Sequence, residues 1–383
     1  MNTLADNKSR LHYLDSLRGL AALYVVFHHL YITCWPLQNA TLPAQGIPWL
    51  SWLKYGHVSV TFFIVLSGFV ITLPLVRCVA ASDPADKPQW RRFFRRRATR
   101  ILPPYFAALV ISLLLVVSLD GFKALKWSDV AGHLLLLQDW GIGDDFAING
   151  PMWSVPVEWH IYFTVPLLYL GWKFLGVGLT AVLSLFAAYS VLHFLPHTSV
   201  RLAISPQYYG IFAVGAAAAF WVGRRPVPAS APAAPGSFIP PLLAALFCLL
   251  VLGLEPWTWY EAHYEHFDLL CSLFAALLII WLAGGESFVR RVLTTAVLVG
   301  LGEMSYSLYL IHGPLLVSFD RLASAFHLSA GAKFLFLCGV AVPLILVLTY
   351  LFHVRFERPF LVTKNRKAGA AAPILLPATQ NLK

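Results

Sequence analysis

The chain has 383 residues, of which 58% are hydrophobic and 12% are charged, and this charged share is about half that of an ordinary soluble domain. The composition excludes such a domain and indicates a protein that crosses a membrane several times. The formal net charge of +10 and the pI of about 9.4 would also suit a nucleic-acid binder. The basic residues are distributed by membrane topology, however, and do not gather on a soluble domain, so we expect no nucleic-acid partner.

Ten apolar segments predict an all-α fold, a polytopic membrane helix bundle of about ten transmembrane helices. With a cytoplasmic N-terminus, the outer segments hold only six of the 28 lysines and arginines, which satisfies the positive-inside rule with both termini cytoplasmic. We expect an uncleaved first helix, a membrane domain over residues 1–360 and a basic cytoplasmic tail over 361–383, with no soluble domain appended. The predicted segments are 14–34, 57–78, 98–119, 153–170, 174–195, 206–222, 240–255, 268–284, 297–318 and 332–354.

The first segment carries one arginine and two histidines, which are rarely placed in a membrane span without a role. At about 100° and 1.5 Å per helical residue, His29 lies about 20° from the stripe of Arg18 and about 16 Å along the axis, whereas His28 points about 80° away. The small residues at 19, 21 and 22 would let another helix pack closely. Two interpretations stay open, an anchoring arginine with structural histidines, or an anion-binding end with proton chemistry deeper in the membrane.

The second and third segments differ in what their polar residues indicate. Ser67 and Gly68 lie among bulky residues, which indicates close helix contact rather than chemistry. A run of arginines then precedes the third segment, and its first members fit a simple positive-inside signal. Arg97 and Arg100 stand three residues apart, so they share one face of a helix that enters the membrane and would suit a phosphorylated ligand.

The predicted outer loop from 120 to 152 is acidic and aromatic. Trp127, Trp140 and Trp153 could stack on sugar rings, or they could form an interfacial belt, and the apolar piece HLLLLQDW could be re-entrant or interfacial. Glu158 begins the fourth segment, close to the outer face, where it could orient a histidine, accept a bond from a sugar hydroxyl or be structurally paired.

The second half of the chain carries fewer polar residues. The stretch 224–241 is rich in proline and alanine and is typical of a flexible linker. His263 and His266 lie among carboxylates without an established ligand spacing, so we expect no metal. In the ninth segment, polar residues that include His312 recur at helical spacing, and they could serve as interhelical hydrogen-bonding groups or contact a substrate.

Five ordered motifs carry a resemblance to a known family. They are LDSLRGLAALYVVFHH, TFFIVLSGF, RRATRILPPY, WSVPVEWHIY and SYSLYLIHGP. Together they resemble the acyltransferase-3 membrane proteins from Asp15 to about Pro359. The chain departs from the commoner family pattern at Trp159, His160 and Ile161, which puts the substrate class in question more than the reaction.

The resemblance implies an integral-membrane O-acetyltransferase of a bacterial inner membrane, in contact with membrane lipids. The implied reaction moves an acetyl or short acyl group from cytoplasmic acetyl-CoA to a sugar hydroxyl of a cell-surface glycan or its lipid-linked precursor. The implied catalytic residues are the base His29 with Glu158 or Asp15 in support. Arg18, Arg97 and Arg100 would bind the acyl-CoA phosphates, and the implied acceptor residues are Trp153, Ser154, Tyr162 and His312.

Two other classes remain as alternatives. A proton-coupled transporter or channel could use Arg18, His29 and Glu158 as an ion path, although the sequence contains no evident internal repeat. A purely structural membrane protein would leave both the arginine run and the shared stripe of Arg18 and His29 without a purpose.

Overall fold

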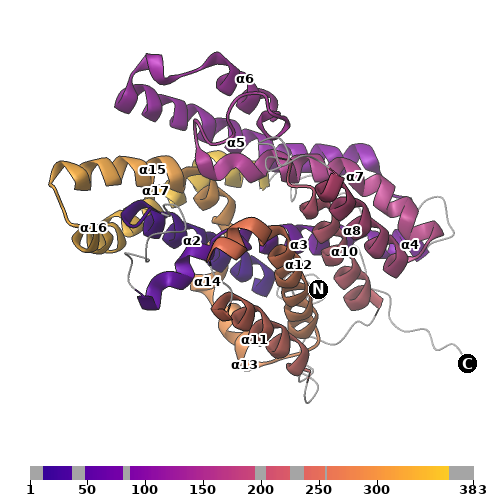
Figure 1. The fold of residues 1–383 in the computed structure, drawn as a ribbon. Helices are drawn as coiled ribbons and strands as arrows, with labels where there is room; N and C mark the ends of the chain where they lie inside the picture. The colour runs from indigo at the N-terminus through magenta and orange to yellow at the C-terminus, as the bar shows by residue number, and fades with distance from the viewer. Residues whose placement is uncertain are drawn as a thin grey trace, which may run out of the picture.

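The computed structural model describes residues 12–36, 48–80, 87–194, 204–224, 237–254 and 257–361, and its regular elements are helices throughout these ranges (Figure 1). The predicted all-α class is therefore confirmed, while the predicted tail after residue 361 lies outside the described residues. In chain order the elements are α2 (His12–Cys34), η1 (Pro48–Tyr55), α3 (Val58–Thr72), α4 (Leu75–Ala80), α5 (Trp90–Asp120), η3 (Phe122–Ala124), α6 (Trp127–Leu135), η4 (Gln138–Trp140), η5 (Gly150–Trp153), α7 (Ser154–Phe174), α8 (Val177–Phe194), α10 (Gln207–Arg224), α11 (Ile239–Leu254), α12 (Trp257–Ala283), α13 (Phe288–Leu293), α14 (Ala296–Glu303), α15 (Ser305–Ala325), α16 (Ala330–Phe336), η6 (Leu337–Ala341), α17 (Val342–Phe352) and η7 (His353–Glu357).

Each of the ten predicted segments corresponds to one helix or to a run of consecutive helices. Within the described ranges, five helices are long and apolar enough to cross a membrane, or six if the bent pair Trp49–Tyr55 and Val58–Thr72 forms one span. Among the other segments, α11 has 16 residues and α14 is separated from α15 at Met304. The protein is a membrane protein, and the count of ten spans and the cytoplasmic placement of both termini stay predictions.

Several helices begin or bend where the sequence pattern did not indicate it. Helix α5 begins at Trp90, eight residues before the predicted span, so the arginine run is helical and extends α5 beyond its apolar part. Pro103 and Pro104 lie inside the same helix, as membrane helices tolerate when neighbouring groups satisfy the freed carbonyls. Helix α12 is kinked at His263, whose φ is −135°, so α12 re-forms just before Asp268.

The packing of α3 against α10 depends on two glycines. A Cβ added at Gly68 would lie 2.2 Å from the carbonyl oxygen of Phe212, and a Cβ at Gly215 would lie 2.1 Å from that of Val65. Each helix therefore presents a glycine to the backbone of the other, which is the close approach that small residues allow in membranes. The predicted helix contact at Gly68 is confirmed.

A second close approach joins α2 to α14. A Cβ added at Gly19 would lie 2.7 Å from the backbone nitrogen of Gly302, and a Cβ at Gly302 would lie 2.0 Å from the carbonyl oxygen of Asp15. Ala22 is fully buried on the same helix. The predicted small-residue packing of the first helix is confirmed, and it fixes the turn of α2 that carries Asp15 and Arg18.

Gly302→Ala is expected to destabilise the protein by about 1–3 kcal/mol, because the added methyl group would overlap backbone rather than a movable side chain. Thermal unfolding in detergent would measure the loss. Gly300→Ala is the matched control on α14, since no atom lies within 4 Å of a Cβ at that position. Equal unfolding temperatures for the two variants would contradict this account of the α2–α14 contact.

Candidate active site

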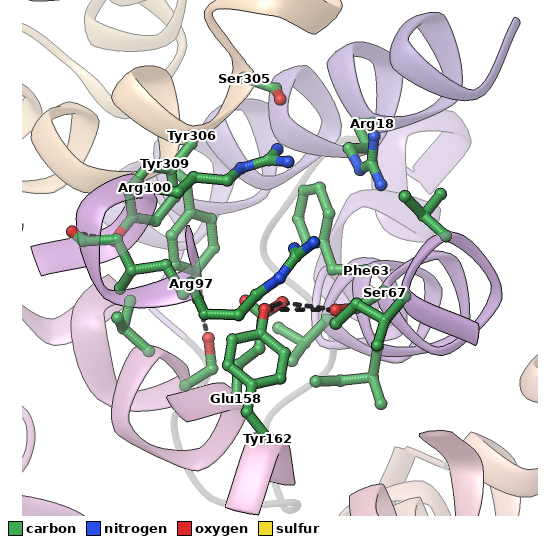
Figure 2. Close-up of a pocket in the computed structure, with 17 residues that line it drawn as sticks. Arg18, Phe63, Ser67, Arg97, Arg100, Glu158, Tyr162, Ser305, Tyr306 and Tyr309 are labelled. Carbon is green, nitrogen blue, oxygen red and sulfur yellow. Dashed lines mark hydrogen bonds between the residues drawn. The ribbon is translucent and has the colours of Figure 1, made fainter. Parts of the chain in front are cut away.

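One cavity collects side chains from α2, α3, α5, α7 and α15, which are distant in sequence (Figure 2). Six of the site residues predicted from the sequence line it, together with residues that the sequence did not single out. The lining residues are Arg18, Val60, Phe63, Ile64, Ser67, Val70, Ile71, Arg97, Arg100, Ile101, Ser154, Val155, Glu158, Tyr162, Ser305, Tyr306 and Tyr309.

Three arginines enter the cavity from two helices. Figure 2 shows the guanidinium groups of Arg18, from α2, and of Arg97 and Arg100, from α5, directed toward the same space. Arg18 is 15% exposed and donates to Asp15 at 3.1 Å, so Asp15 orients Arg18 and does not itself line the cavity. The arginines at 91, 92, 95 and 96 are exposed on the same helix. Arg97 and Arg100, three residues apart, therefore face the cavity, while the other arginines of this run face solvent.

Arg97 lies over two aromatic rings. Its guanidinium carbon is 5.8 Å from the Tyr162 ring centroid and 5.9 Å from that of Phe93, a distance at which cation–π attraction contributes. Its Nε atom is buried and has no hydrogen-bond partner among the described residues. A buried, unpaired donor of this kind favours an anionic or oxygen-rich ligand.

Glu158 is the acidic side chain among the described residues that line the cavity. Its Oε1 accepts from Ser67 Oγ at 2.8 Å and from the hydroxyl of Tyr162, as the dashed lines in Figure 2 show. The prediction that Ser67 serves only close helix contact was wrong, because its hydroxyl faces the cavity while the adjacent Gly68 makes the helix contact. Glu158 also lies in the same cavity as the arginines, and its predicted position near the outer face stays a prediction.

Ser154 and Trp153 are neighbours in sequence with different environments. Ser154 Oγ and the Tyr309 hydroxyl lie 2.7 Å apart inside the cavity. The Trp153 ring is absent from the described lining and stacks on His57, with centroids 5.8 Å apart and an interplanar angle of 2°. Trp153 is the N-cap residue of α7, so its side chain leaves the helix axis in a direction that helical spacing does not predict.

His29 pairs with His312, a contact that sequence spacing did not indicate. Nε2 of His312 lies 3.3 Å from Nδ1 of His29. Nδ1 of His312 lies 2.9 Å from the Leu308 carbonyl oxygen, and Nδ1 of His29 lies 2.9 Å from the Val25 carbonyl oxygen. Since a carbonyl only accepts, both Nδ1 atoms carry the proton in the neutral pair. His312 Nε2 then accepts from His29, and His29 Nε2 keeps its lone pair.

His28 has a different set of contacts. Its Nδ1 lies 2.8 Å from the Leu53 carbonyl oxygen and 3.3 Å from the Gly56 nitrogen. These contacts fix the segment between η1 and α3 against α2. The two adjacent histidines therefore face different elements: His29 faces α15, and His28 faces the connection into α3.

Neither His29 nor His312 lines the cavity, but Tyr309 connects the cavity to this histidine pair. The Tyr309 ring lies in the cavity, and its centroid is 6.0 Å from that of His312. The His312 centroid is 5.1 Å from that of His29. A path of contacts therefore leads from the arginine cavity, past the hydroxyls of Ser154 and Tyr309, to the histidine pair.

The predicted outer loop is joined to α7 by a contact between the buried Asp139 and the partly buried His160. Asp139 Oδ2 lies 2.7 Å from Nδ1 of His160, and Trp140 Nε1 lies 3.2 Å from the same nitrogen. Burial raises the pKa of the Asp139 carboxyl above its ordinary value, and the bond to His160 opposes that rise. Trp140 and Trp127 expose much of their rings. The departure from the family pattern at His160 therefore supports the loop and not the cavity.

The helices that form this arrangement lie within a segment that matches a known family. The model of a family described as an acyltransferase domain matches residues 11–351, which include α2 and every helix that lines the cavity. The chain belongs to this acyltransferase family. The resemblance seen in the five motifs is confirmed, and with it the prediction of an acyltransferase enzyme at the level of the family.

Three relatives illustrate the range of the family. The chain is 26% identical to YrhL of Bacillus subtilis over 79% of this chain and 48% of that protein. It is 26% identical to the acyltransferase MdmB of Streptomyces mycarofaciens over 95% of each chain. It is 24% identical to the peptidoglycan O-acetyltransferase OatA of Listeria monocytogenes over 79% of this chain and 49% of that protein.

The chain spans about half the length of YrhL and OatA. No solved structure matches it significantly. Among the described residues, no group of three or more histidine, cysteine, aspartate or glutamate side chains is arranged to hold a metal ion.

Proposed function

We propose that this protein transfers an acetyl or short acyl group from acyl-CoA to a sugar hydroxyl of a cell-surface glycan or its lipid-linked precursor. The observation that carries the proposal is the path from three converging arginines to a pair of hydrogen-bonded histidines. Acyl transfer from CoA requires a site for a polyanionic donor and a proton acceptor, and this path has arginines that suit the first and histidines that suit the second. The name of OatA, a peptidoglycan O-acetyltransferase, agrees with a glycan acceptor.

The arginine end suits the donor. Arg18, Arg97 and Arg100 supply three positive charges against the single carboxylate of Glu158 among the described lining residues, so the cavity has a net attraction for phosphate groups. Guanidinium groups bind phosphate through paired, charge-assisted hydrogen bonds, which are stronger than neutral ones. The acyl chain of a donor held there would extend along the cavity toward Tyr309.

The histidine end suits the proton transfer. In the proposed step, Nε2 of His29 removes the proton of the acceptor hydroxyl as its oxygen attacks the thioester carbonyl carbon. The tetrahedral intermediate then collapses, the carbon–sulfur bond breaks, and the CoA thiolate leaves and takes up the proton from His29. His312 accepts the Nδ1 hydrogen of His29 throughout, which holds the ring orientation and stabilises the charged form.

The charge distribution supports different sides for the two substrates. By the positive-inside rule the arginine end of α2 and α5 is expected at the cytoplasmic face, while His29 lies about 16 Å further along α2. In this proposal acyl-CoA binds from the cytoplasm, the acceptor enters from the opposite side, and the acyl group passes within the bundle.

A comparison of cells with and without the gene for this chain tests the function. Acetate released from envelope glycans by mild alkali should fall when the gene is deleted and return when it is restored. A proton-coupled transporter, the alternative function, would leave the glycan acetate unchanged.

Charge removal at Arg97 or Arg100 should weaken acyl-CoA binding by about 10- to 100-fold, because a hydrogen bond to a charged group contributes about 1.5–3 kcal/mol. Equilibrium binding of labelled acetyl-CoA to purified Arg97→Gln and Arg100→Gln proteins would measure the effect. Arg92→Gln is the matched control, since this arginine is exposed on the same helix. An equal loss in all three variants would show a diffuse surface attraction in place of a site.

A further inference from the structure

A second polar cluster lies where the N-terminal ends of α3, α7 and α10 meet the kinked part of α12. His57 and Trp153 are the N-cap residues of α3 and α7, and Gln207 is the first residue of α10. Asp268 follows the kink of α12 by five residues. By the charge distribution these three helix starts and the turn of α12 after its kink share the outward-facing side of the bundle. We call His57, Trp153, Gln207 and Asp268 the outer cluster.

Hydrogen bonds connect this outer cluster around one carboxylate. Asp268 is 1% exposed, and its Oδ1 accepts from Thr61 Oγ1 at 2.5 Å and lies 3.2 Å from Nδ1 of His57. Its Oδ2 accepts from Gln207 Nε2 at 3.3 Å. On its other nitrogen, His57 Nε2 lies 2.9 Å from the Tyr208 hydroxyl. The imidazole is therefore hydrogen-bonded at Nε2, while its buried Nδ1 lies beside the carboxylate without a hydrogen bond among the described residues.

One acceptor in the outer cluster has no partner. Gln207 is fully buried, and its Oε1 makes no hydrogen bond among the described residues. Leaving a buried acceptor unpaired costs about 1–3 kcal/mol. Because Asp268 accepts from the other end of the same amide, Oε1 is free to accept a bond from an O–H group that enters beside the carboxylate.

His57 is the accessible edge of the outer cluster. Its side chain is 25% exposed, whereas Asp268 behind it is closed to solvent. Aromatic rings surround the imidazole, with Trp153 parallel to it and Tyr264 against its edge at a centroid distance of 4.8 Å. An aromatic wall beside hydrogen-bonding groups is a surface that suits a sugar, which presents apolar C–H faces and hydroxyls together.

The outer cluster adjoins the proposed reaction path at two points. Trp153 is followed by Ser154, which contacts Tyr309 in the cavity. His57 is preceded by Gly56, whose nitrogen lies 3.3 Å from the ring of His28, the residue next to His29. The outer cluster thus adjoins the end of the path that is remote from the three arginines.

We propose that the outer cluster is the acceptor-binding site, and that it binds an uncharged, hydroxyl-bearing sugar ring. The inference rests on the proposed acyl transfer and names its acceptor side. Gln207 Oε1 accepts from one sugar hydroxyl, and Trp153 and His57 border the ring. The buried carboxylate of Asp268 repels anions here, so the polyanionic donor is confined to the arginine end and the two substrates do not compete.

In this assignment His57 and Gln207 bind the acceptor, and they do not take part in proton transfer. Their replacement should therefore lower transfer to the glycan without changing the binding of the donor. A purely structural polar cluster predicts the reverse, a lower unfolding temperature with transfer per folded molecule unchanged.

The test uses cells in which the gene is deleted and returned as wild type, Gln207→Met or His57→Phe. Alkali-released glycan acetate, divided by the amount of folded protein in the membrane, should fall at least 10-fold in both variants. The acetyl-CoA dissociation constant of each purified protein should stay within twofold of wild type. His266→Phe, an exposed histidine on the same helix as Asp268, is the matched control and should retain acetate.

Other outcomes overturn the assignment. Glycan acetate within twofold of wild type in both variants would make the outer cluster structural, and a parallel loss of acetyl-CoA binding would make it part of the donor site. If His57→Phe does not fold, His57→Gln replaces it and is judged by the same limits. Wild-type cells with no more glycan acetate than deleted cells would overturn the proposed function itself, and the acceptor site with it.

Discussion

His29→Ala is expected to lower acyl transfer by about 10²–10⁴-fold, the usual contribution of a general base. The protein should remain folded, because the side chain of His29 hydrogen-bonds to the carbonyl of its own helix and to His312. Loss of the ring leaves Nε2 of His312 without its donor but changes no backbone contact between helices. Single-turnover transfer from labelled acetyl-CoA in the native membrane, normalised to folded protein, would measure the effect.

His28→Ala is the matched control for this prediction. Its ring contacts Leu53 and Gly56, so its loss should loosen the connection into α3 and lower the unfolding temperature. Transfer per folded molecule should stay within a few-fold of wild type. If His28→Ala abolishes transfer and His29→Ala does not, the helical register proposed for the first segment is wrong.

The sequence predicted most of the helical architecture. Length and apolarity were sufficient for the ten helical segments, because a membrane helix must satisfy its backbone within itself and cannot depend on distant partners. The glycines at 19 and 68 also revealed close approaches, since a missing side chain among bulky ones has few other uses. Spacing on one helix correctly grouped Arg97 with Arg100 and set them apart from the exposed arginines.

Contacts between different helices could not be predicted in the same way. The bond from Ser67 to Glu158 joins positions 91 residues apart, and the pairing of His29 with His312 spans 283. Periodicity determines which residues share a face, but not which helix that face meets. The only signal for Ser67 was a hydroxyl beside a glycine, and close packing already explained it.

The position of Trp153 was missed for a local reason. It precedes the first residue of α7 and has the role of its N-cap, where the direction of a side chain depends on the loop before it. The sequence placed Trp153 and Ser154 together as acceptor residues, yet only Ser154 lines the cavity. Trp153 stacks on His57, the N-cap residue of α3, and the sequence did not predict that α3 and α7 meet there.

Glu158→Gln is expected to lower the turnover number for acyl transfer at least 10-fold while acetyl-CoA binding is retained or becomes tighter. The substitution keeps the shape of the side chain and an oxygen that accepts from Ser67 or Tyr162, so it removes mainly the negative charge. The three arginines then line the cavity with no carboxylate among the described lining residues, and only Arg18 keeps a partner, Asp15, outside the lining. The cavity should hold the polyanionic product CoA longer, and its release should become slower.

Separate measurements of the dissociation constant for acetyl-CoA and of the steady-state turnover would distinguish this effect from simple damage to the site. A damaged cavity should lower both the affinity for acetyl-CoA and the turnover number. Loss of the charge alone should lower the turnover number while the affinity is retained or rises. Tyr162→Phe is the matched control, because it removes one hydrogen bond to Glu158 and leaves the charge in place. Its acetyl-CoA affinity should not rise. Unchanged turnover in Glu158→Gln would reduce the carboxylate to a packing role and leave the three arginines as the functional charges of the cavity.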